Sequence, residues 1–166
     1  GMTGANALEP GVLKGDILIN MDSETEGELY VGCAGGIDTC GYFTPKFEDV
    51  PAGSKAFQLI VKGLKGGHSG MDIILGRANA NKVMNALLLK ATEKFNARVA
   101  DIQGGSLRNA IPRESFVTIT VPEAKAEELL AYVPEFEAVV KEQFAAVEPE
   151  MSITVVPAEM PAKVID

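Results

Sequence analysis

The order of the strands and helices predicted from residue 54 onward is the feature that most restricts the fold. Residues 54–65 alternate apolar and polar side chains, with Phe57, Leu59 and Val61 on one side, which predicts a half-buried strand. Similar patterns predict helices over 77–95 and 123–147, and strands over 97–105, 115–121 and 151–156. The resulting order, strand, helix, strand, strand, helix, strand, is the split βαβ or ferredoxin-like pattern.

The two predicted helices each carry an apolar stripe that would face the sheet. The first stripe consists of Ala80, Val83, Met84, Leu87, Leu88, Ala91 and Phe95, and the second of Leu129, Leu130, Val133, Phe136, Val140, Phe144 and Val147. Pro134 lies inside the second helix and should kink it or split it in two. The expected fold class is therefore α+β, an antiparallel sheet with two helices on one face.

The segment before this unit has a different pattern. Residues 16–22 and 28–36 are predicted to form strands joined by an acidic turn, which gives an N-terminal β-hairpin extension. Residues 39–50 contain Pro45, which favours an edge strand, and this strand should pair with 54–65 as a hairpin. A domain boundary is expected near residues 35 to 38.

Composition and charge narrow the function classes. A chain of 166 residues with 46% hydrophobic residues can form one domain, or one domain and a piece of another. The net charge of −8 makes nucleic acid an unfavourable partner, and no stretch approaches the roughly 18 to 20 apolar residues that span a bilayer. The N-terminal residues lack the features of a signal peptide, and Cys33 and Cys40 form no C-x-x-C pair. A cytoplasmic location is expected.

Three places could carry chemistry. His68, the only histidine, stands between glycines and could donate a hydrogen bond to a carboxylate or an oxyanion, or it could be a solvated loop residue. Asn109 could bind a substrate carboxylate or amide, or it could form an Asx turn. Asp22 follows a predicted strand and begins an acidic cluster, which could hold a metal or could be a solvated turn. The set lacks a nucleophile with its base and a full metal shell.

Three stretches of the sequence resemble the bacterial aminoacyl-histidine dipeptidases, or Xaa-His dipeptidases, within the larger family of co-catalytic zinc peptidases. They are LINMDSETEGELYVGCAGGID (18–38), KGLKGGHSGMDIILGRANANK (62–82) and IQGGSLRNAIPRE (102–114). The family combines a catalytic domain that binds two zinc ions with an inserted ferredoxin-like lid that commonly forms the dimer contact. The resemblance implies a fragment of the catalytic domain over 1–35, the lid and dimerisation domain over 36–157, and a return linker over 158–166.

The resemblance also implies roles for the three candidate residues. Asp22 matches a metal-binding carboxylate, His68 matches the lid histidine that contacts the substrate or its oxyanion, and Asn109 matches a lid asparagine that binds substrate. The other metal ligands and the general base of the family are missing, so the chain alone should neither hydrolyse a dipeptide nor retain zinc. A homodimer through the lid is expected. The alternative from another class is a free-standing ferredoxin-like module that dimerises or binds a small ligand, with residues 16–22 in its own sheet.

Overall fold

The computed structural model describes residues 3–21, 25–32, 35, 37 and 39–166. The chain divides into two compact units, Gly1–Tyr42 and Phe43–Asp166. Within the described residues, no helix is both long enough and apolar enough to cross a membrane.

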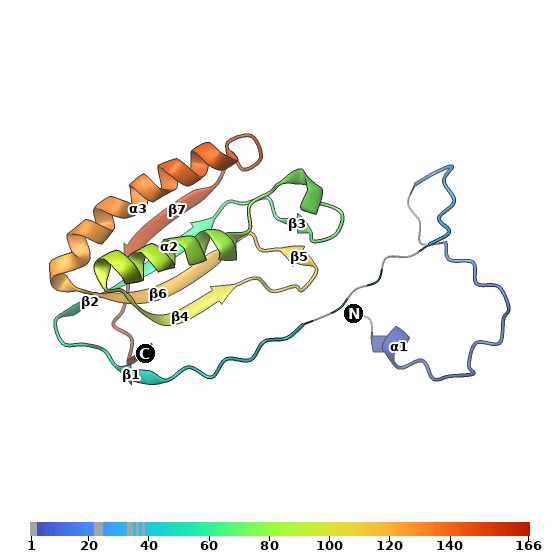
Figure 1. The fold of residues 1–166 in the computed structure, drawn as a ribbon, viewed down its shortest axis with the longest axis horizontal. Helices are drawn as coiled ribbons and strands as arrows, with labels where there is room; N and C mark the ends of the chain where they lie inside the picture. The colour runs from blue at the N-terminus through green and yellow to red at the C-terminus, as the bar shows by residue number, and fades with distance from the viewer. Residues whose placement is uncertain (1–2, 22–24, 33–34, 36, 38) are drawn as a thin grey trace. The chain divides into compact units, whose positions relative to one another are not determined.

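The larger unit is built on a four-stranded antiparallel sheet with the strand order β4-β6-β2-β7. Helices α2 and α3 lie together over one face of this sheet (Figure 1). The elements in chain order are β2 (Ser54–Lys62), α2 (Ala80–Phe95), β4 (Arg98–Gly104), β6 (Ser115–Pro122), α3 (Glu123–Phe144) and β7 (Ser152–Pro157). This arrangement confirms the predicted ferredoxin-like, split βαβ fold.

The apolar stripes of the two helices form the core, as predicted. All seven residues of the α2 stripe are buried. On α3, Leu129, Val133 and Val140 are buried, and Leu130, Phe136 and Phe144 are partly buried against the core. The helix ends at Phe144, earlier than predicted, so Val147 of the predicted stripe lies beyond it. Helix α3 therefore covers the sheet less completely than α2, because part of its apolar stripe lies at the edge of the contact with the sheet and is only partly buried.

Pro134 does not split α3, which runs as one helix through this position. A proline removes one hydrogen bond to the carbonyl four residues earlier and crowds that carbonyl. Pro134 is exposed, so water can reach the backbone there. Leu129 and Val140 are buried in the same core on either side of the proline and hold both halves of the helix on the sheet.

The predicted hairpin between residues 39–50 and 54–65 is wrong. Strand β2 already pairs with β6 along one edge and with β7 along the other, so neither edge is open to a third partner. The short strand β1 (Phe47–Asp49) instead pairs with β8 (Lys163–Ile165), near the end of the chain. Residues 158–166 thus contribute a strand to this unit.

The predicted N-terminal β-hairpin is absent from the described residues of the smaller unit. Residues 16–21 and 28–32 form no strand, and the short helix α1 (Thr3–Asn6) is the one regular element among the residues of this unit that the structure describes. Ile17 and Leu18 are each 82% exposed. A two-stranded hairpin needs a further layer that buries its apolar face, and the described residues of this unit do not supply one.

Candidate functional site

The segments that carry His68 and Asn109 meet in a small two-stranded ribbon. Strand β3 (Gly67–His68) pairs with β5 (Ala110–Ile111), with His68 opposite Ala110. The backbone N–H of Ser69 also donates to the carbonyl of Asn109, at 2.9 Å. The predicted open loop at His68 therefore contains a short strand, and two candidate residues far apart in the sequence lie side by side.

The imidazole of His68 has a defined hydrogen-bonding state. Its Nδ1 accepts the backbone N–H groups of Gly70 at 3.1 Å and Met71 at 3.3 Å. A ring nitrogen that accepts carries no proton, so the neutral ring has its proton on Nε2. His68 is exposed, and Nε2 has no hydrogen-bond partner among the residues that the structure describes. The ring therefore presents a free donor to a ligand.

Gly70 allows this geometry because it lies directly against the ring. A Cβ at Gly70 would be 3.3 Å from both Nδ1 and Cε1 of His68, a tight contact. Gly67 has a φ of +139°, and a Cβ there would come within 2.6 Å of the Asp72 carboxylate. The glycines around the histidine therefore let the backbone approach the side chains of its own loop closely.

Asp72 and Arg77 brace the same loop from inside. The backbone N–H of His68 donates to Oδ2 of Asp72 at 2.7 Å. Arg77 Nη1 donates to the carbonyl of Gly66 at 2.6 Å and lies 3.8 Å from the Asp72 carboxylate. The backbone at Gly66 and at His68 is thus held by the two members of an ion pair.

The ends of the loop are held by Glu148, which follows α3. Its side chain accepts the backbone N–H of Lys65 on Oε2 at 2.8 Å and that of Ala78 on Oε1 at 3.0 Å. Glu148 is only 2% exposed.

Helix α2 begins two residues after Ala78, with Asn79 as its N-cap. The Asn79 side chain accepts the N–H of Lys82 at 3.2 Å, so the helix starts later than the predicted residue 77.

The Asn109 side chain is available for a ligand. Asn109 is exposed, and its backbone carbonyl is the group that binds the His68 segment. No Asx turn forms at this residue within the part of the chain that the structure describes, because the turn hydrogen bonds there join backbone groups such as the Ala110 N–H and the Leu107 carbonyl, at 3.2 Å. The amide therefore keeps a donor and an acceptor for other partners.

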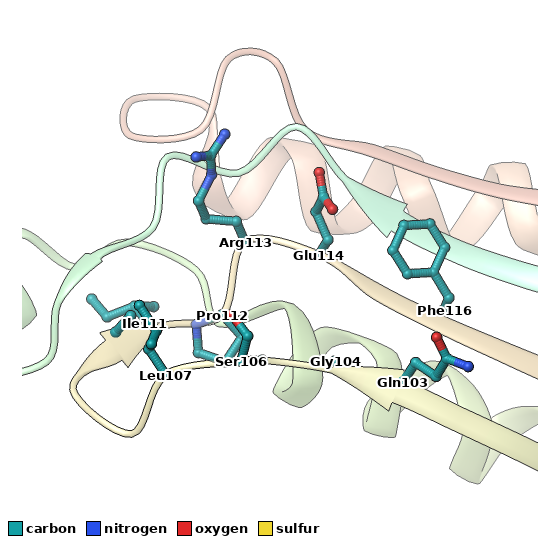
Figure 2. A pocket seen from close by; sticks show the side chains of 11 residues that line it. Gln103, Gly104, Ser106, Leu107, Ile111, Pro112, Arg113, Glu114 and Phe116 are labelled. Carbon is teal, nitrogen blue, oxygen red and sulfur yellow. The ribbon is translucent and has the colours of Figure 1, made fainter. Parts of the chain in front are cut away.

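Two hollows lie beside this ribbon. One, of about 780 Å³, is lined by the histidine loop, the first turn of α2 and the loop after β4, and Ser69, Arg77, Asn81 and Lys82 give it a polar rim. Figure 2 shows the other, of about 550 Å³, where the chain leaves β4 and returns through β5 to β6. Leu107 and Ile111 lie at one end of it, and Gln103 and Phe116 at the other. A small substrate or part of one could lie beside either face of the ribbon.

The third candidate, Asp22, lies outside the described residues. Among the residues that are described, no group of three or more His, Cys, Asp or Glu side chains could hold a metal ion. The described part of the chain therefore does not fit a metal site by itself, and no catalytic step can be derived through one. What remains is an exposed imidazole on β3 and an exposed amide in the turn just before β5.

Sequence reasoning missed the residues that hold this site. In the sequence, nothing distinguishes Asp72 and Arg77 from other charged loop residues. Glu148 likewise looks like any other acidic residue in a chain with a net charge of −8. Their role depends on hydrogen bonds to backbone groups at other places in the chain, and no spacing in the sequence encodes those bonds. The one available signal was weak: Glu148 directly follows the apolar stripe of α3, where a carboxylate can become buried.

Residues 59–148 match the peptidase dimerisation domain. The chain belongs to this family. The match runs from strand β2 to Glu148, so it covers both helices and both segments of the ribbon.

Two relatives in this family are similar over nearly all of the chain. The cytosol non-specific dipeptidase of Escherichia coli K12 is 46% identical over 153 residues, which is 92% of this chain and 32% of that protein. The crystal structure of an aminoacylhistidine dipeptidase from Vibrio alginolyticus matches with a TM-score of 0.80 and 39% identity, over 100% of this chain and 34% of that chain. The chain thus spans about a third of the length of the relatives it matches.

Proposed function

We propose that the chain is part of a zinc-dependent dipeptidase that hydrolyses Xaa-His dipeptides, and that its larger unit acts as lid and dimerisation domain. The observation that carries the proposal is the pairing of β3 with β5, which brings His68 and Asn109 together. The names of the two relatives, a non-specific dipeptidase and an aminoacylhistidine dipeptidase, support the reaction class.

His68 would act by donating a hydrogen bond from Nε2. Attack on a peptide carbonyl places negative charge on its oxygen, and a donor aimed at that oxygen stabilises the transition state more than the bound substrate. Asn109 would contact the substrate through its amide, which can bind a carboxylate or a peptide group. These two roles need no nucleophile from this chain.

The rest of the machinery would lie in the remainder of a longer protein. Residues 1–35 would belong to the zinc-binding catalytic domain, with Asp22 as a metal ligand, residues 36–157 to the lid, and residues 158–166 to the return linker. The two zinc ions would be held mainly outside this chain. A cytoplasmic location is proposed from the cytosol dipeptidase relative.

The alternative of a free-standing ligand-binding or dimerisation module is less well supported. It requires residues 16–22 to form a strand of the module's own sheet. The described residues of this segment, 16–21, form no strand, and Ile19 is 81% exposed. An apolar segment of this kind favours a fragment whose partner surface lies elsewhere in a longer protein.

The test compares the full-length enzyme with the 166-residue chain. The full-length enzyme should hydrolyse a Xaa-His dipeptide such as carnosine, and removal of metal by a chelator should abolish turnover. The 166-residue chain should show no turnover with or without added zinc. A panel of Xaa-His and Xaa-Ala dipeptides measures the preference. Hydrolysis by the 166-residue chain, or no dipeptide hydrolysis by the full-length enzyme, contradicts the proposal.

The same unit should form a homodimer through strand β4. Among the described residues this strand is at the edge of the four-stranded sheet and pairs only with β6, although β8 lies near it without pairing. Ile102 on β4 is 55% exposed. Pairing of the edge with a second copy would bury this side chain and extend the sheet by an isologous contact.

We expect light scattering to give the mass of a dimer for the 166-residue chain. Ile102→Lys should shift the protein toward monomer, because it places a charge in the contact. Val139→Lys is the matched control, since Val139 is 66% exposed on α3, on a different element. A wild-type monomer at high concentration, or equal effects of the two variants, would argue against dimerisation through β4.

A further inference from the structure

Glu148 is the one charged residue that is buried among the described residues, and no step of the proposed reaction uses its carboxylate. It is 2% exposed, although an isolated carboxylate is costly to bury. Its two oxygens accept from Lys65 N–H at 2.8 Å and Ala78 N–H at 3.0 Å. These two residues stand at the two ends of the segment that carries His68.

This geometry fixes the distance between the ends of the loop. The two oxygens of one carboxylate are rigidly spaced, so the two amides that bind them are held at a fixed separation. Without the carboxylate, the N–H of Ala78, whose residue is 1% exposed, would be left unsatisfied in the core. Glu148 therefore selects one conformation of the segment from 65 to 78.

Glu148 is connected to the imidazole through a series of contacts within the loop. Ala78 is next to Arg77, which donates to Gly66, and Asp72 accepts from the His68 backbone. The ring orientation is then set by the N–H groups of Gly70 and Met71 on Nδ1. Each of these bonds depends on the loop keeping its path, because both donors and acceptors are backbone or loop groups.

We propose that Glu148 is a positioning residue for His68. By accepting hydrogen bonds from both ends of the loop, it keeps Nδ1 as an acceptor and Nε2–H as the donor to substrate. This rests on the proposed role of His68. Glu148 itself touches no substrate. Its effect on turnover should therefore disappear when the imidazole is absent.

The first test uses the single histidine as a spectroscopic reporter. In the wild-type 166-residue chain, ¹⁵N-edited NMR should give ring shifts of one tautomer, with the proton on Nε2. Glu148→Gln replaces one acceptor oxygen by an NH₂ group that faces a donor, so one end of the loop is released. Its ring shifts should move toward those of a free histidine that exchanges between tautomers.

The matched control for this variant is Glu137→Gln. Glu137 lies on α3 and also accepts a backbone N–H, that of Ile153 at 3.1 Å, but it does not touch the loop. Its replacement should leave the His68 ring shifts at the wild-type values. Thermal unfolding of both variants shows whether they remain folded.

The second test is kinetic and uses the full-length enzyme. Glu148→Gln should lower kcat on the order of 10- to 100-fold, the loss expected for a misplaced catalytic group, with a much smaller change in KM. The double variant His68→Ala/Glu148→Gln should be no slower than His68→Ala alone, because the two residues act as one unit. Glu137→Gln should keep wild-type kcat.

The outcomes separate this inference from the proposed function. Additive losses in the double variant, or unchanged ring shifts in Glu148→Gln, overturn the positioning role. If His68→Ala keeps wild-type turnover, the proposed function fails. The NMR test still shows whether Glu148 fixes the orientation of the His68 ring. Should Glu148→Gln not fold, Glu148→Asp replaces it: its carboxylate is one methylene shorter and does not reach both amides, so the same losses are expected.

Discussion

Replacing His68 by alanine in the full-length enzyme should lower kcat by about 100- to 1,000-fold, the usual loss for one oxyanion donor. The donor is the Nε2–H group. Because Nδ1 accepts the two backbone N–H groups, Nε2 carries the only N–H of the neutral ring. A bond that strengthens as the carbonyl oxygen gains charge acts on kcat more than on KM. Steady-state kinetics with a Xaa-His dipeptide measure both constants.

The neighbouring Asn109 supplies the comparison for this experiment. It lies beside the histidine segment through the bond from Ser69 N–H to its carbonyl, which an Asn109→Ala change retains. An amide that holds substrate before and during reaction should affect mainly KM. Metal content and unfolding temperature should stay at wild-type values in both variants. A His68→Ala enzyme with wild-type kcat would show that this histidine is a solvated loop residue.

The parts of the fold that were predictable are those governed by periodicity. The alternation in 54–65 and the spacing of the α2 stripe each identify one face that must be buried, and the structure buries it. The order of these elements then left few topologies, and the ferredoxin-like one was correct. Strand pairing followed from the topology, not from local patterns, and so the local hairpin predicted between residues 39–50 and 54–65 was wrong.

The candidate site was predictable in its residues but not in its geometry. Glycines around His68 and the composition of the loop at Asn109 marked both places, although the β3 and β5 strands that join them are two residues each. Strands this short leave no pattern in a sequence. The role of Glu148 was hidden for a similar reason, because its partners are backbone amides at Lys65 and Ala78.

Truncation of Leu87 to alanine should lower the free energy of unfolding by about 2 to 5 kcal/mol. Leu87 is 0% exposed at the centre of the helix and lies in the same core as Leu59 and Ile119 of the sheet. The cost combines the lost burial of the side chain with the cavity left between helix and sheet. Small domains have a total stability of only about 5 to 15 kcal/mol, so the change should be plain in urea or guanidinium unfolding.

Leu89 on the same helix is the matched control, because it is 52% exposed. The same chemical change there creates no cavity, and Leu89→Ala should shift the free energy of unfolding by about 0.5 kcal/mol or less. Helix α3 provides a second pair: Leu129 is 0% exposed and should behave like Leu87, whereas the partly buried Leu130 should cost less. Equal effects at Leu87 and Leu89 would mean that α2 does not present the predicted face to the sheet. The β-sheet order would then have to be reconsidered together with the placement of His68, whose loop leads directly into this helix.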